Sequence, residues 1–381
     1  MSPSLQKLVL IEMHGHPELL QNILDLLSLT EIEVNVLTLS HIVNLLDITT
    51  LGRNIKLLPR EKKINPREIE ISHKDLLDAS DLILITTMIA DWPGYSALTK
   101  KYASACIVHN ANFSFHNSQA ITTPSFRETK ATLRQSIDCL MAVKSTKRKI
   151  LENCKAIFLL SYPIVQNVNK NTHSAIRVLP YMYRKNINTT IKNSLQITFP
   201  GGCSTENKDY SFLIEWLQQL DTLSISKPLS IIFLGNTLSK KSKNLIAKIH
   251  SIKPSPIQII SFDHYLSQPK YDQYLCSSDL LISPLRPMVH FSYFDEWYGK
   301  TKHSGSINDA IKYQLPILLP EFMNNYQQVH DGLIFYKNQV EFIEVLNRAY
   351  LHSEISRKNQ IVSDIAKVAR ELELSFSEIL V

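Results

Sequence analysis

The sequence predicts an α/β protein with two domains, each built on a mainly parallel sheet. Three observations predict this class. The length, 381 residues, suits two domains of ordinary size. Short apolar runs alternate with segments whose apolar residues recur at helical spacing, the pattern of parallel strands joined by helices. The alternation is lost over residues 179–194, which have little periodicity, and it restarts after them.

The first half opens as a strand–helix–strand unit. Residues 7–12 are an apolar run typical of a buried strand, and 13–17 form a turn that contains a glycine. Residues 18–29 have helical spacing, and 33–39 are the second strand. Two further apolar runs that end in polar residues, 81–86 and 105–109, are expected to be strands buried on both faces.

The second half repeats this organisation. Residues 195–199 are a predicted strand, 200–203 a glycine turn and 210–220 a helix. Further strands are expected at 229–234, 257–262, 279–283 and 317–319, with helical stretches between most of them. The tail, 355–380, is amphipathic and is interpreted as one or two closing helices.

These elements set the expected domain boundaries. The first domain is predicted over residues 1–178, a linker over 179–194, the second domain over 195–360 and a C-terminal helix over 361–381. In open parallel sheets, ligands bind beyond the carboxyl ends of the strands, and a second domain naturally closes a cleft there.

Charge and composition exclude several classes of protein. Hydrophobic residues make up 44% and charged residues 20%, which excludes a disordered or fibrous chain. The net charge of +6 is too small to make nucleic acid the expected partner, and no zinc-finger or RNP pattern occurs. Residues 1–192 hold 23 Lys and Arg against 16 Asp and Glu, whereas the rest of the chain is nearly neutral. This asymmetry suggests an anionic surface or acceptor on one side only.

Cysteine usage and hydropathy predict the compartment. The five cysteines are odd in number, widely spaced and form no CxxC, which favours reduced thiols in the cytosol. The N-terminus lacks the features of a signal peptide, and no window approaches 18 apolar residues. We therefore expect a cytoplasmic protein, with peripheral contact at the inner face of the cell membrane as the furthest departure.

The stretch 296–320 is the most informative. Ser304-Gly305-Ser306 opens a predicted helix, and Ser306 with Asp309 fits a capping pattern. Backbone N–H groups and the helix dipole at such a start form a site for phosphate. Lys300 and Lys302 lie just upstream and could neutralise a diphosphate. The alternative is a capped surface helix with two solvated lysines.

A second glycine turn, Pro200–Thr205, follows the first strand of the second domain. Gly201 and Gly202 let the backbone approach a ligand closely, and Lys208 follows shortly after. A tight strand-to-helix turn is an equally good interpretation. Neither a P-loop nor G-x-G-x-x-G occurs in the chain, which disfavours a dinucleotide-dependent dehydrogenase.

In these residues the chain resembles the GT-B glycosyltransferases, in particular the large group 1 type that uses nucleotide sugars. The resemblance rests on ITFPGGCSTENKDYSFLIEWL, SIIFLGN, YDQYLCSSDLLISPL and SGSINDAIKYQLPILLP with a following EF. In order and spacing these segments span residues 195 to about 346. The N-terminal half is similar in architecture only, with HGHPELL and IVHNANF in loops expected to face the cleft.

The resemblance implies two facing Rossmann-like domains and a glycosyltransferase of the hexosyltransferase type. The second domain would bind a nucleotide-diphosphate sugar, and the first a saccharide or lipid-linked glycan whose hydroxyl receives the sugar. Biosynthesis of a bacterial surface polysaccharide is the expected setting, by analogy with the family. No cofactor and no metal are expected. Two alternatives stay open: a sugar-nucleotide epimerase of similar fold, and a GT-B-like binding or scaffold protein without catalysis.

The resemblance also assigns residues. Ser304, Gly305 and Ser306 would lie by the donor diphosphate, and Asp309 would accept hydrogen bonds from the ribose hydroxyls. The chain departs from the family at three positions. Thr301 stands where retaining members often have an acidic residue, Cys203 replaces the usual arginine, and Gln314 stands where a glycine is common. Lys208 matches the lysine of the glycine turn, and Lys300 and Lys302 could supply the charge of the missing arginine.

Four residues at the predicted strand ends of the first domain are candidates for the catalytic base: His14, His16, Asp91 and His109. An inverting transfer needs a group that deprotonates the acceptor hydroxyl, and His or Asp can serve. We favour His109, then Asp91; Glu296 is the alternative from the second domain. A histidine at a strand end is more often a hydrogen-bonded structural residue than a base, and Asp91, which precedes Trp92-Pro93, is more often a turn residue.

Two further features have both a functional and an ordinary interpretation. Phe262 follows a strand where the family packs a loop on the nucleotide base, so it would stack there or simply pack within its loop. The cationic run Lys144–Lys149 is either a solvated helix face or a contact with anionic lipid or a lipid-linked acceptor.

Overall fold

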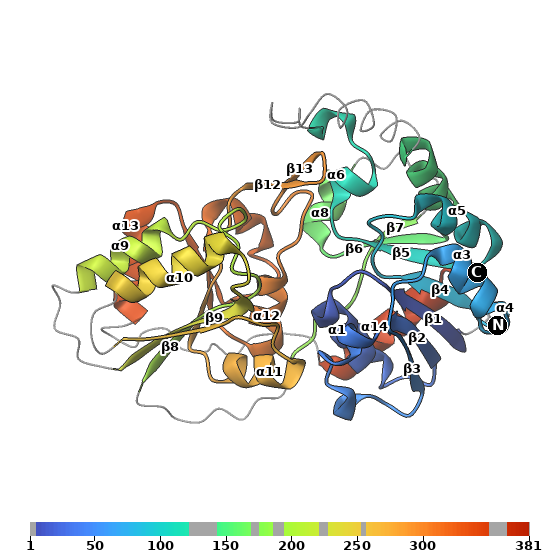
Figure 1. Cartoon of the computed structure of the whole chain (residues 1–381), viewed down its shortest axis with the longest axis horizontal. Helices are drawn as coiled ribbons and strands as arrows, with labels where there is room; N and C mark the ends of the chain where they lie inside the picture. Colours follow the sequence, from blue (N-terminus) through green and yellow to red (C-terminus); the bar gives the residue numbers. More distant parts are fainter. Residues whose placement is uncertain are drawn as a thin grey trace. The chain divides into compact units, whose positions relative to one another are not determined.

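In the computed structural model the described residues are 5–121, 143–168, 175–185, 194–220, 228–252, 257–349 and 364–380. The chain divides into two compact units. Unit 1 comprises Met1–Tyr181, His290–His303 and Ile365–Val381, and unit 2 comprises Met182–Val289 and Ser304–Asp364. Each unit has a parallel sheet with helices on its faces, so the predicted α/β class is confirmed (Figure 1).

The sheet of unit 1 has seven parallel strands in the order β3-β2-β1-β4-β5-β6-β7. The strands are β1 (Lys7–Glu12), β2 (Glu33–Leu39), β3 (Ile55–Arg60), β4 (Leu82–Ile85), β5 (Ser104–Val108), β6 (Ala156–Leu159) and β7 (Ala175–Val178). The order reverses direction between β1 and β4, and a crevice opens at the carboxyl ends of strands at such a switch point. β1 and β4 are apolar runs because helices cover both faces of the sheet.

Helix α1 (Pro17–Leu27) shows why the first predicted helix forms. Pro17 stands at its first turn, where a missing N–H costs nothing, and Leu20, Ile23, Leu24 and Leu27 form a buried face. The other helical elements of unit 1 before the C-terminus are α2 (Ser40–Val43), η1 (Ile48–Thr50), α3 (Pro66–Ser72), α4 (Lys74–Asp78), α5 (Trp92–Lys101), α6 (Ala111–Ser114), η2 (Ser118–Ala120) and α8 (Tyr162–Asn167). Residues 143–153 are also helical.

The predicted C-terminal helix is present as α14 (Ile365–Ser377), and it packs on α1 in unit 1 (Figure 1). Its apolar stripe includes Leu372 and Phe376, and the Phe376 ring meets Phe158 of β6 edge to face at 5.5 Å. The helix therefore completes the core of the unit that begins the chain.

A hairpin changes the boundary between the units. Strands β12 (Met288–Phe291) and β13 (Phe294–Trp297) pair with each other, and residues 290–303 belong to unit 1, whereas the sequence analysis placed them in the second domain. Two kinds of contact hold the hairpin in unit 1: packing between aromatic rings, and hydrogen bonds from backbone N–H groups to a buried carboxylate. Phe294 and Phe291 contact the ring of Phe113, and the buried Glu296 carboxylate accepts hydrogen bonds from backbone N–H groups of α6.

The sheet of unit 2 has six parallel strands in the order β10-β9-β8-β11-β14-β15. They are β8 (Leu195–Phe199), β9 (Leu229–Asn236), β10 (Gln258–Phe262), β11 (Leu280–Ile282), β14 (Ile317–Pro320) and β15 (Leu333–Tyr336). Five of these strands coincide with the predicted ones, and β15 was not predicted. The switch point lies between β8 and β11.

The helical elements of unit 2 are α9 (Ser211–Leu220), α10 (Lys240–Ile252), α11 (Gln268–Cys276), α12 (Gly305–Tyr313), η3 (Glu321–Tyr326) and α13 (Gln339–Asn347). Its core gathers large side chains from strands and helices, including Phe199, Trp216, Phe233 and Phe342. Residues 186–193 of the predicted linker lie outside the described residues.

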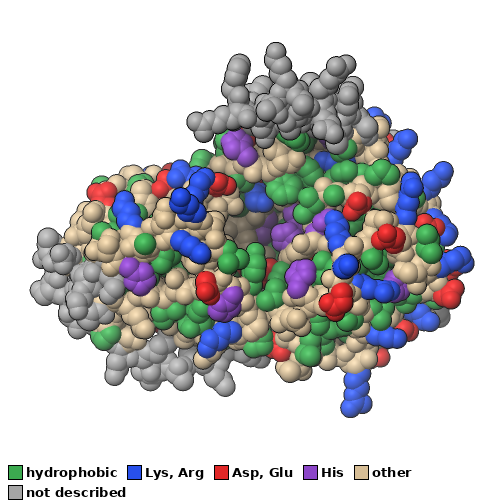
Figure 2. Space-filling model, in the orientation of Figure 1, with side chains coloured by type: hydrophobic (Ala, Val, Ile, Leu, Met, Phe, Trp, Pro, Cys, Tyr) green, Lys and Arg blue, Asp and Glu red, His purple; other side chains and the backbone are tan. Residues whose placement is uncertain are grey.

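In the described part of the chain, no helix is both long and apolar enough to span a membrane. Cys106, Cys154, Cys203 and Cys276 are free thiols, and Cys139 lies outside the described residues. On the face shown in Figure 2, Lys and Arg side chains are interspersed with Asp and Glu.

Candidate functional site

In unit 1, a buried carboxylate lies at the switch point of the sheet. Glu12 ends β1 and is 1% exposed. Its Oε1 accepts hydrogen bonds from the backbone N–H groups of His14 (2.8 Å) and Gly15 (2.9 Å), and its Oε2 from the hydroxyls of Thr86 and Thr87 (2.6 Å each). Four donors offset the cost of burying this charge. Glu12 thereby ties the loop after β1 to the loop after β4.

Two of the predicted histidines stack on each other beside this carboxylate. The rings of His16 and His109 lie 4.2 Å apart, with 14° between their planes. His109 Nε2 lies 2.8 Å from the carbonyl oxygen of Thr86, which can only accept, so Nε2 carries the proton of the neutral ring and Nδ1 has the lone pair. Burial and the adjacent His16 hold the pKa of His109 well below its usual range. His109 is therefore a neutral imidazole at neutral pH.

The other two candidates are linked through Lys63. Its Nζ lies 3.2 Å from Asp91 Oδ2 and 3.4 Å from His14 Nδ1. Burial, followed by the positive charge of Lys63, lowers the pKa of His14. His16 (φ 113°) and Asp91 (φ 59°) both adopt left-handed backbone conformations directly before α1 and α5. Such strain in non-glycine residues is concentrated at functional sites.

All four predicted catalytic residues thus lie at the carboxyl ends of β1, β4 and β5, and contacts join them in two pairs, His16 with His109 and His14 with Asp91 through Lys63. Glu12 and Lys63 were not among the predicted site residues. An acidic residue directly after four apolar strand residues was the available signal for Glu12. Nothing in the sequence pointed to Lys63, which follows β3.

In unit 2, the glycine turn lies at the equivalent switch point. Gly201 has φ 68°, and Gly235 at the end of β9 packs directly against the turn. A Cβ at Gly235 would lie 2.3 Å from the carbonyl oxygen of Gly201 and 2.5 Å from Cα of Gly202, so only glycine fits there. A hollow of about 440 Å³ adjoins this turn. It is lined by Gly202, Cys203, Ser204, Thr205, Glu206, Asn236 and the start of α10.

Lys208 lies under the glycine turn. It is buried, and its Nζ donates a hydrogen bond to the carbonyl oxygen of Pro200 (2.6 Å). Burial lowers the pKa of Lys208 to about 8, against the opposing effects of Cys203 and Asp309. An ammonium group with this pKa is stabilised strongly by a bound anion, because the anion replaces the lost solvation.

Helix α12 carries the predicted diphosphate site. The helix begins at Gly305, and Ser304 is its N-cap residue without a side-chain capping bond. A Cβ at Gly305 would meet nothing within 4 Å, so the helix start is open. The predicted capping pair Ser306 and Asp309 is wrong, because the helix begins before Ser306 and the Ser306 hydroxyl instead accepts a hydrogen bond from Ser283 after β11 (3.0 Å).

Asp309 is joined to the glycine turn through Tyr271 of α11. The Tyr271 hydroxyl donates to Asp309 Oδ2 (2.9 Å) and accepts a hydrogen bond from the N–H of Gly201 (3.2 Å). Predicted donor residues from the turn and from α12 are thus in one hydrogen-bonded chain. Tyr271 was not predicted, since a tyrosine on a helix has no distinctive spacing.

The remaining donor candidates are placed differently. Phe262 ends β10 and packs against Tyr274 of α11, at 5.3 Å between ring centroids. Lys300 and Lys302 belong to the hairpin segment of unit 1. Lys300 is exposed near the ring of Trp297, and Lys302 donates to Asn110 Oδ1 (2.6 Å). Burial lowers the pKa of Lys302.

Two departures from the family pattern have structural explanations. The Thr301 hydroxyl accepts a hydrogen bond from the N–H of Trp297 (2.8 Å), closing the turn that follows the hairpin. Gln314 adopts the left-handed conformation at the C-cap of α12, the position where glycine is usually preferred, and its Nε2 donates to the carbonyl of Lys185.

Within the described residues no group of three or more His, Cys, Asp and Glu side chains is arranged to hold a metal ion. A neutral imidazole such as that of His109 can act as a general base, and an open helix start with a nearby ammonium group can bind an anion.

No protein family and no curated protein matches the sequence. Solved structures do match. UDP-GlcNAc 2-epimerase from Methanocaldococcus jannaschii has a TM-score of 0.52 at 13% identity, covering 97% of this chain and 99% of that one. WaaG, a glycosyltransferase involved in lipopolysaccharide biosynthesis, has a TM-score of 0.55 at 13% identity, covering 98% and 99%. The S. aureus MnaA–UDP structure has a TM-score of 0.54 at 12% identity, covering 99% and 98%.

The chain has the GT-B fold. The match extends over nearly the full length of each of these structures, so the predicted GT-B architecture is confirmed for the chain as a whole. Proteins of this fold among the neighbours include glycosyltransferases and UDP-GlcNAc 2-epimerases.

Proposed function

We propose that this GT-B protein is a glycosyltransferase that moves a sugar from a nucleotide-diphosphate sugar to a hydroxyl of a saccharide or lipid-linked glycan. The observation that carries the proposal is the donor constellation of unit 2. Gly201, Tyr271 and Asp309 form one hydrogen-bonded chain beside the buried Lys208 and the open start of α12. These groups lie at the switch point of a parallel sheet, where nucleotides bind in this class of fold.

Unit 2 would stabilise the nucleoside diphosphate as it leaves the sugar. Charge develops on the oxygen between the sugar and the β-phosphate as the glycosidic bond breaks. The N–H groups at the start of α12 and the ammonium of Lys208 are preorganised donors for that charge. The Asp309 carboxylate, which accepts the Tyr271 hydroxyl, would also accept a hydrogen bond from a ribose hydroxyl. In this proposal the residues of unit 2 bind the donor and stabilise the leaving group.

The acceptor hydroxyl requires a base in an inverting transfer. His109 is the best candidate in unit 1, because its Nε2 is committed to the Thr86 carbonyl and its Nδ1 has a lone pair. The stacked ring of His16 and the Glu12 network hold the loops around it. Asp91 is the second candidate, although its carboxylate is paired with Lys63.

An epimerase that acts on its donor without an acceptor is the second candidate function, favoured by the epimerases among the structural neighbours. It would use the same donor groups of unit 2. The third possibility is a GT-B-like binding protein without catalysis, which would bind nucleotide and convert nothing.

Calorimetry with UDP, GDP and ADP, followed by assays with the matching nucleotide sugars, separates these functions. A transferase releases nucleoside diphosphate at a rate that rises with a saccharide acceptor. An epimerase converts the sugar nucleotide without acceptor, and a binding protein gives binding heat only. Absence of heat with all three nucleotides at millimolar concentration would contradict the donor site itself.

The proposed setting is glycan assembly on the cytoplasmic side of a bacterial membrane. It is supported by the shared fold of a glycosyltransferase of lipopolysaccharide biosynthesis. The cationic run 144–149 is only in part a surface feature, since Lys147 is buried and its Nζ lies 3.3 Å from the ring centroid of Phe113.

A further inference from the structure

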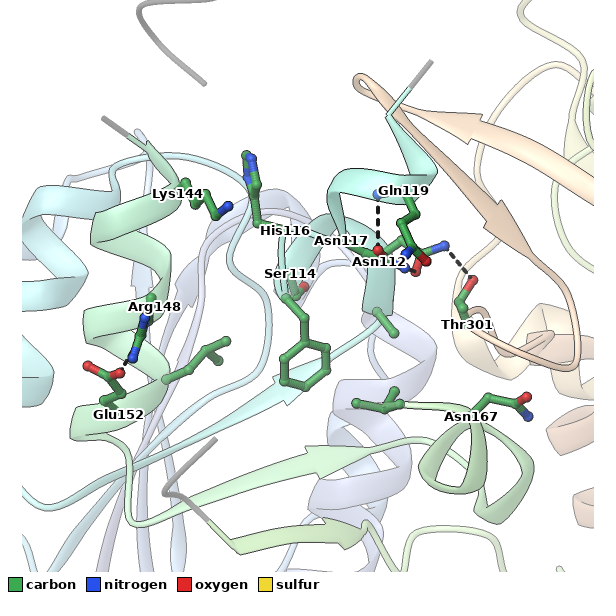
Figure 3. Close-up of a pocket in the computed structure, with 14 residues that line it drawn as sticks. Asn112, Ser114, His116, Asn117, Gln119, Lys144, Arg148, Glu152, Asn167 and Thr301 are labelled. Carbon is green, nitrogen blue, oxygen red and sulfur yellow. Dashed lines mark hydrogen bonds and ion pairs between the residues drawn. The ribbon is translucent and has the colours of Figure 1, made fainter. Parts of the chain in front are cut away.

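A pocket of about 690 Å³, lined mostly by polar residues, lies within unit 1 (Figure 3). This volume is in the range of small-molecule sites. The pocket is lined from four segments: the residues after β5, the helical residues 143–153, α8 and the turn after β13. Ala111 and Asn112, on its wall, follow His109 by only two and three residues. The pocket wall therefore includes residues that closely follow the candidate base in the chain.

One wall of the pocket is cationic. Lys144 and Arg148 line it from the same helical segment, and Glu152 is the only acidic side chain among the described lining residues. Arg148 Nε donates to Glu152 Oε1 at 2.6 Å, an ion pair between residues one helical turn apart. The described residues 143–153 hold four Lys and Arg, at 144 and 147–149, against this one acid.

His116 is a further residue of the pocket that has positive charges nearby. His116 is 8% exposed and lines the pocket. Burial lowers its pKa to about 4, and the nearby charges of Lys147 and Lys144 act in the same direction. Burial is thus the main cause of the lowered pKa of His116, and the two lysines add to it.

The opposite wall presents carboxamides and a hydroxyl. Asn112, Asn117 and Gln119 come from α6 and the residues after it, and Thr301 comes from the hairpin segment (Figure 3). Asn117 Nδ2 donates to Asn112 Oδ1 at 3.0 Å, and Asn112 Nδ2 lies 3.5 Å from the Thr301 hydroxyl. Carboxamides and hydroxyls are the groups that hydrogen-bond sugar hydroxyls, because each can donate and accept.

We propose that this pocket binds the acceptor, and that the acceptor is an anionic saccharide whose phosphate or carboxylate group contacts Lys144 and Arg148. The inference rests on the proposed function, since it names the acceptor class of the same reaction. The carboxamide wall would hold the sugar ring, and the cationic wall would hold the charged group. This would explain why the basic excess of the chain lies in its first half.

The test measures binding of simple probes without any donor present. Titration of the whole protein with a hexose 6-phosphate, a hexuronate and the neutral hexose should show the two anionic sugars binding at least about tenfold more tightly. The double variant Lys144→Gln/Arg148→Gln should lose this preference. Lys149→Gln is the matched control, because Lys149 is exposed on the same helical segment and does not line the pocket. It should keep the preference within about twofold.

Three outcomes would overturn the proposal. They are equal binding of neutral and anionic sugars, a preference that survives the double variant, and inorganic phosphate that binds as tightly as the sugar phosphate. Vesicles with anionic phospholipid form a separate arm: vesicle binding lost in the double variant, without sugar binding, assigns the cations to a membrane instead. UDP binding is measured in parallel on every variant. If UDP fails to bind the wild type, the proposed function fails; if UDP binds and the anionic sugars do not, only the acceptor proposal fails.

Discussion

At the scale of single residues, Asp309 connects structure and donor binding most directly. Its carboxylate accepts the Tyr271 hydroxyl within unit 2, and the predicted capping role is absent. Asp309→Asn keeps the shape of the side chain but removes its charge. We expect nucleoside diphosphate affinity to fall more than about tenfold with little change in stability, because a charged acceptor gives the stronger hydrogen bond.

Titration calorimetry with the best-binding nucleotide and thermal unfolding test this prediction together. Asp263→Asn is the matched control, since Asp263 is an exposed carboxylate of the same unit bonded to the adjacent His264. A variant that melts lower yet binds nucleotide normally would leave Asp309 only a structural role.

We expect His109 to accept the proton of the acceptor hydroxyl. We expect His109→Ala to lower turnover by about 10²–10⁴-fold while nucleotide affinity is kept, because a general base contributes that much and the proposed donor contacts lie in unit 2. Parallel alanine variants of His14, His16 and Asp91 should lose less. His41→Ala, at an exposed position on α2, is the control. Near-normal turnover in all four variants would indicate a retaining mechanism without a side-chain base.

His116 should make stability depend on pH. Burial lowers the pKa of His116 to about 4, whereas an unfolded histidine titrates near 6.5. Between these values the unfolded state binds more protons, so the free energy of unfolding falls as the pH decreases from about 6.5 to 4. His116→Asn, which tolerates the left-handed backbone at this position (φ 51°), should weaken that dependence. Urea unfolding at pH 7 and pH 5 checks this; equal pH dependence in wild type and variant would contradict it.

At the scale of elements, the end of β9 and the glycine turn form one close-packed unit. Gly235→Ala would force a Cβ against backbone atoms of Gly201, Gly202 and Cys203. We expect a loss of about 1–3 kcal/mol in stability and weaker nucleotide binding, because overpacking shifts the turn. Gly305→Ala is the contrasting variant: its Cβ meets open space, so it should not destabilise the protein. A Gly235→Ala protein with unchanged unfolding and binding would show that the turn adapts freely.

The hairpin segment illustrates a second element-scale effect. Glu296 is fully buried, and burial raises its pKa against the hydrogen bonds from Phe113, Thr301 and Asn112. Its two oxygens accept hydrogen bonds from backbone N–H groups of α6. We therefore interpret Glu296, the alternative base predicted from the sequence, as a clamp that holds the hairpin on α6. Glu296→Gln should cost about 1–3 kcal/mol, because an amide presents only one acceptor oxygen to two donors. Chemical denaturation measures this, and an unchanged midpoint would remove the clamp assignment.

At the scale of the whole molecule, local patterns predicted the fold well because both sheets are parallel and their strands are continuous apolar runs. β1, β4, β8 and β9 follow directly from such runs. The residues after these strands were predicted as site residues for the same reason, since parallel strands present their ends together. β3, β6, β7 and β15 were not predicted. β3, β7 and β15 are mostly half-buried, whereas β6 is a buried apolar run of the kind recognised elsewhere.

What the sequence could not show depends on contacts between distant segments. The hairpin segment 290–303 follows unit 2 residues in the chain but packs on Phe113, more than 170 positions earlier. Periodicity reports neighbours within one element and carries no information about which unit a hairpin contacts. Lys302 was therefore predicted as a donor residue, whereas its Nζ binds Asn110 of unit 1.

Because each unit consists of separate stretches of the chain, one break in the sequence does not separate the two units. A fragment that spans residues 195–360 carries the hairpin segment away from its partners, leaving Phe294 (1% exposed in the full chain) open to water. A fragment that ends at residue 178 lacks both that segment and α14, whose Leu372 and Phe376 fill the core. Exposed apolar surface of this kind favours aggregation. We therefore expect neither half of the chain to fold well alone, and recombination that exchanges unit 1 between related genes would have to include three separate stretches of sequence.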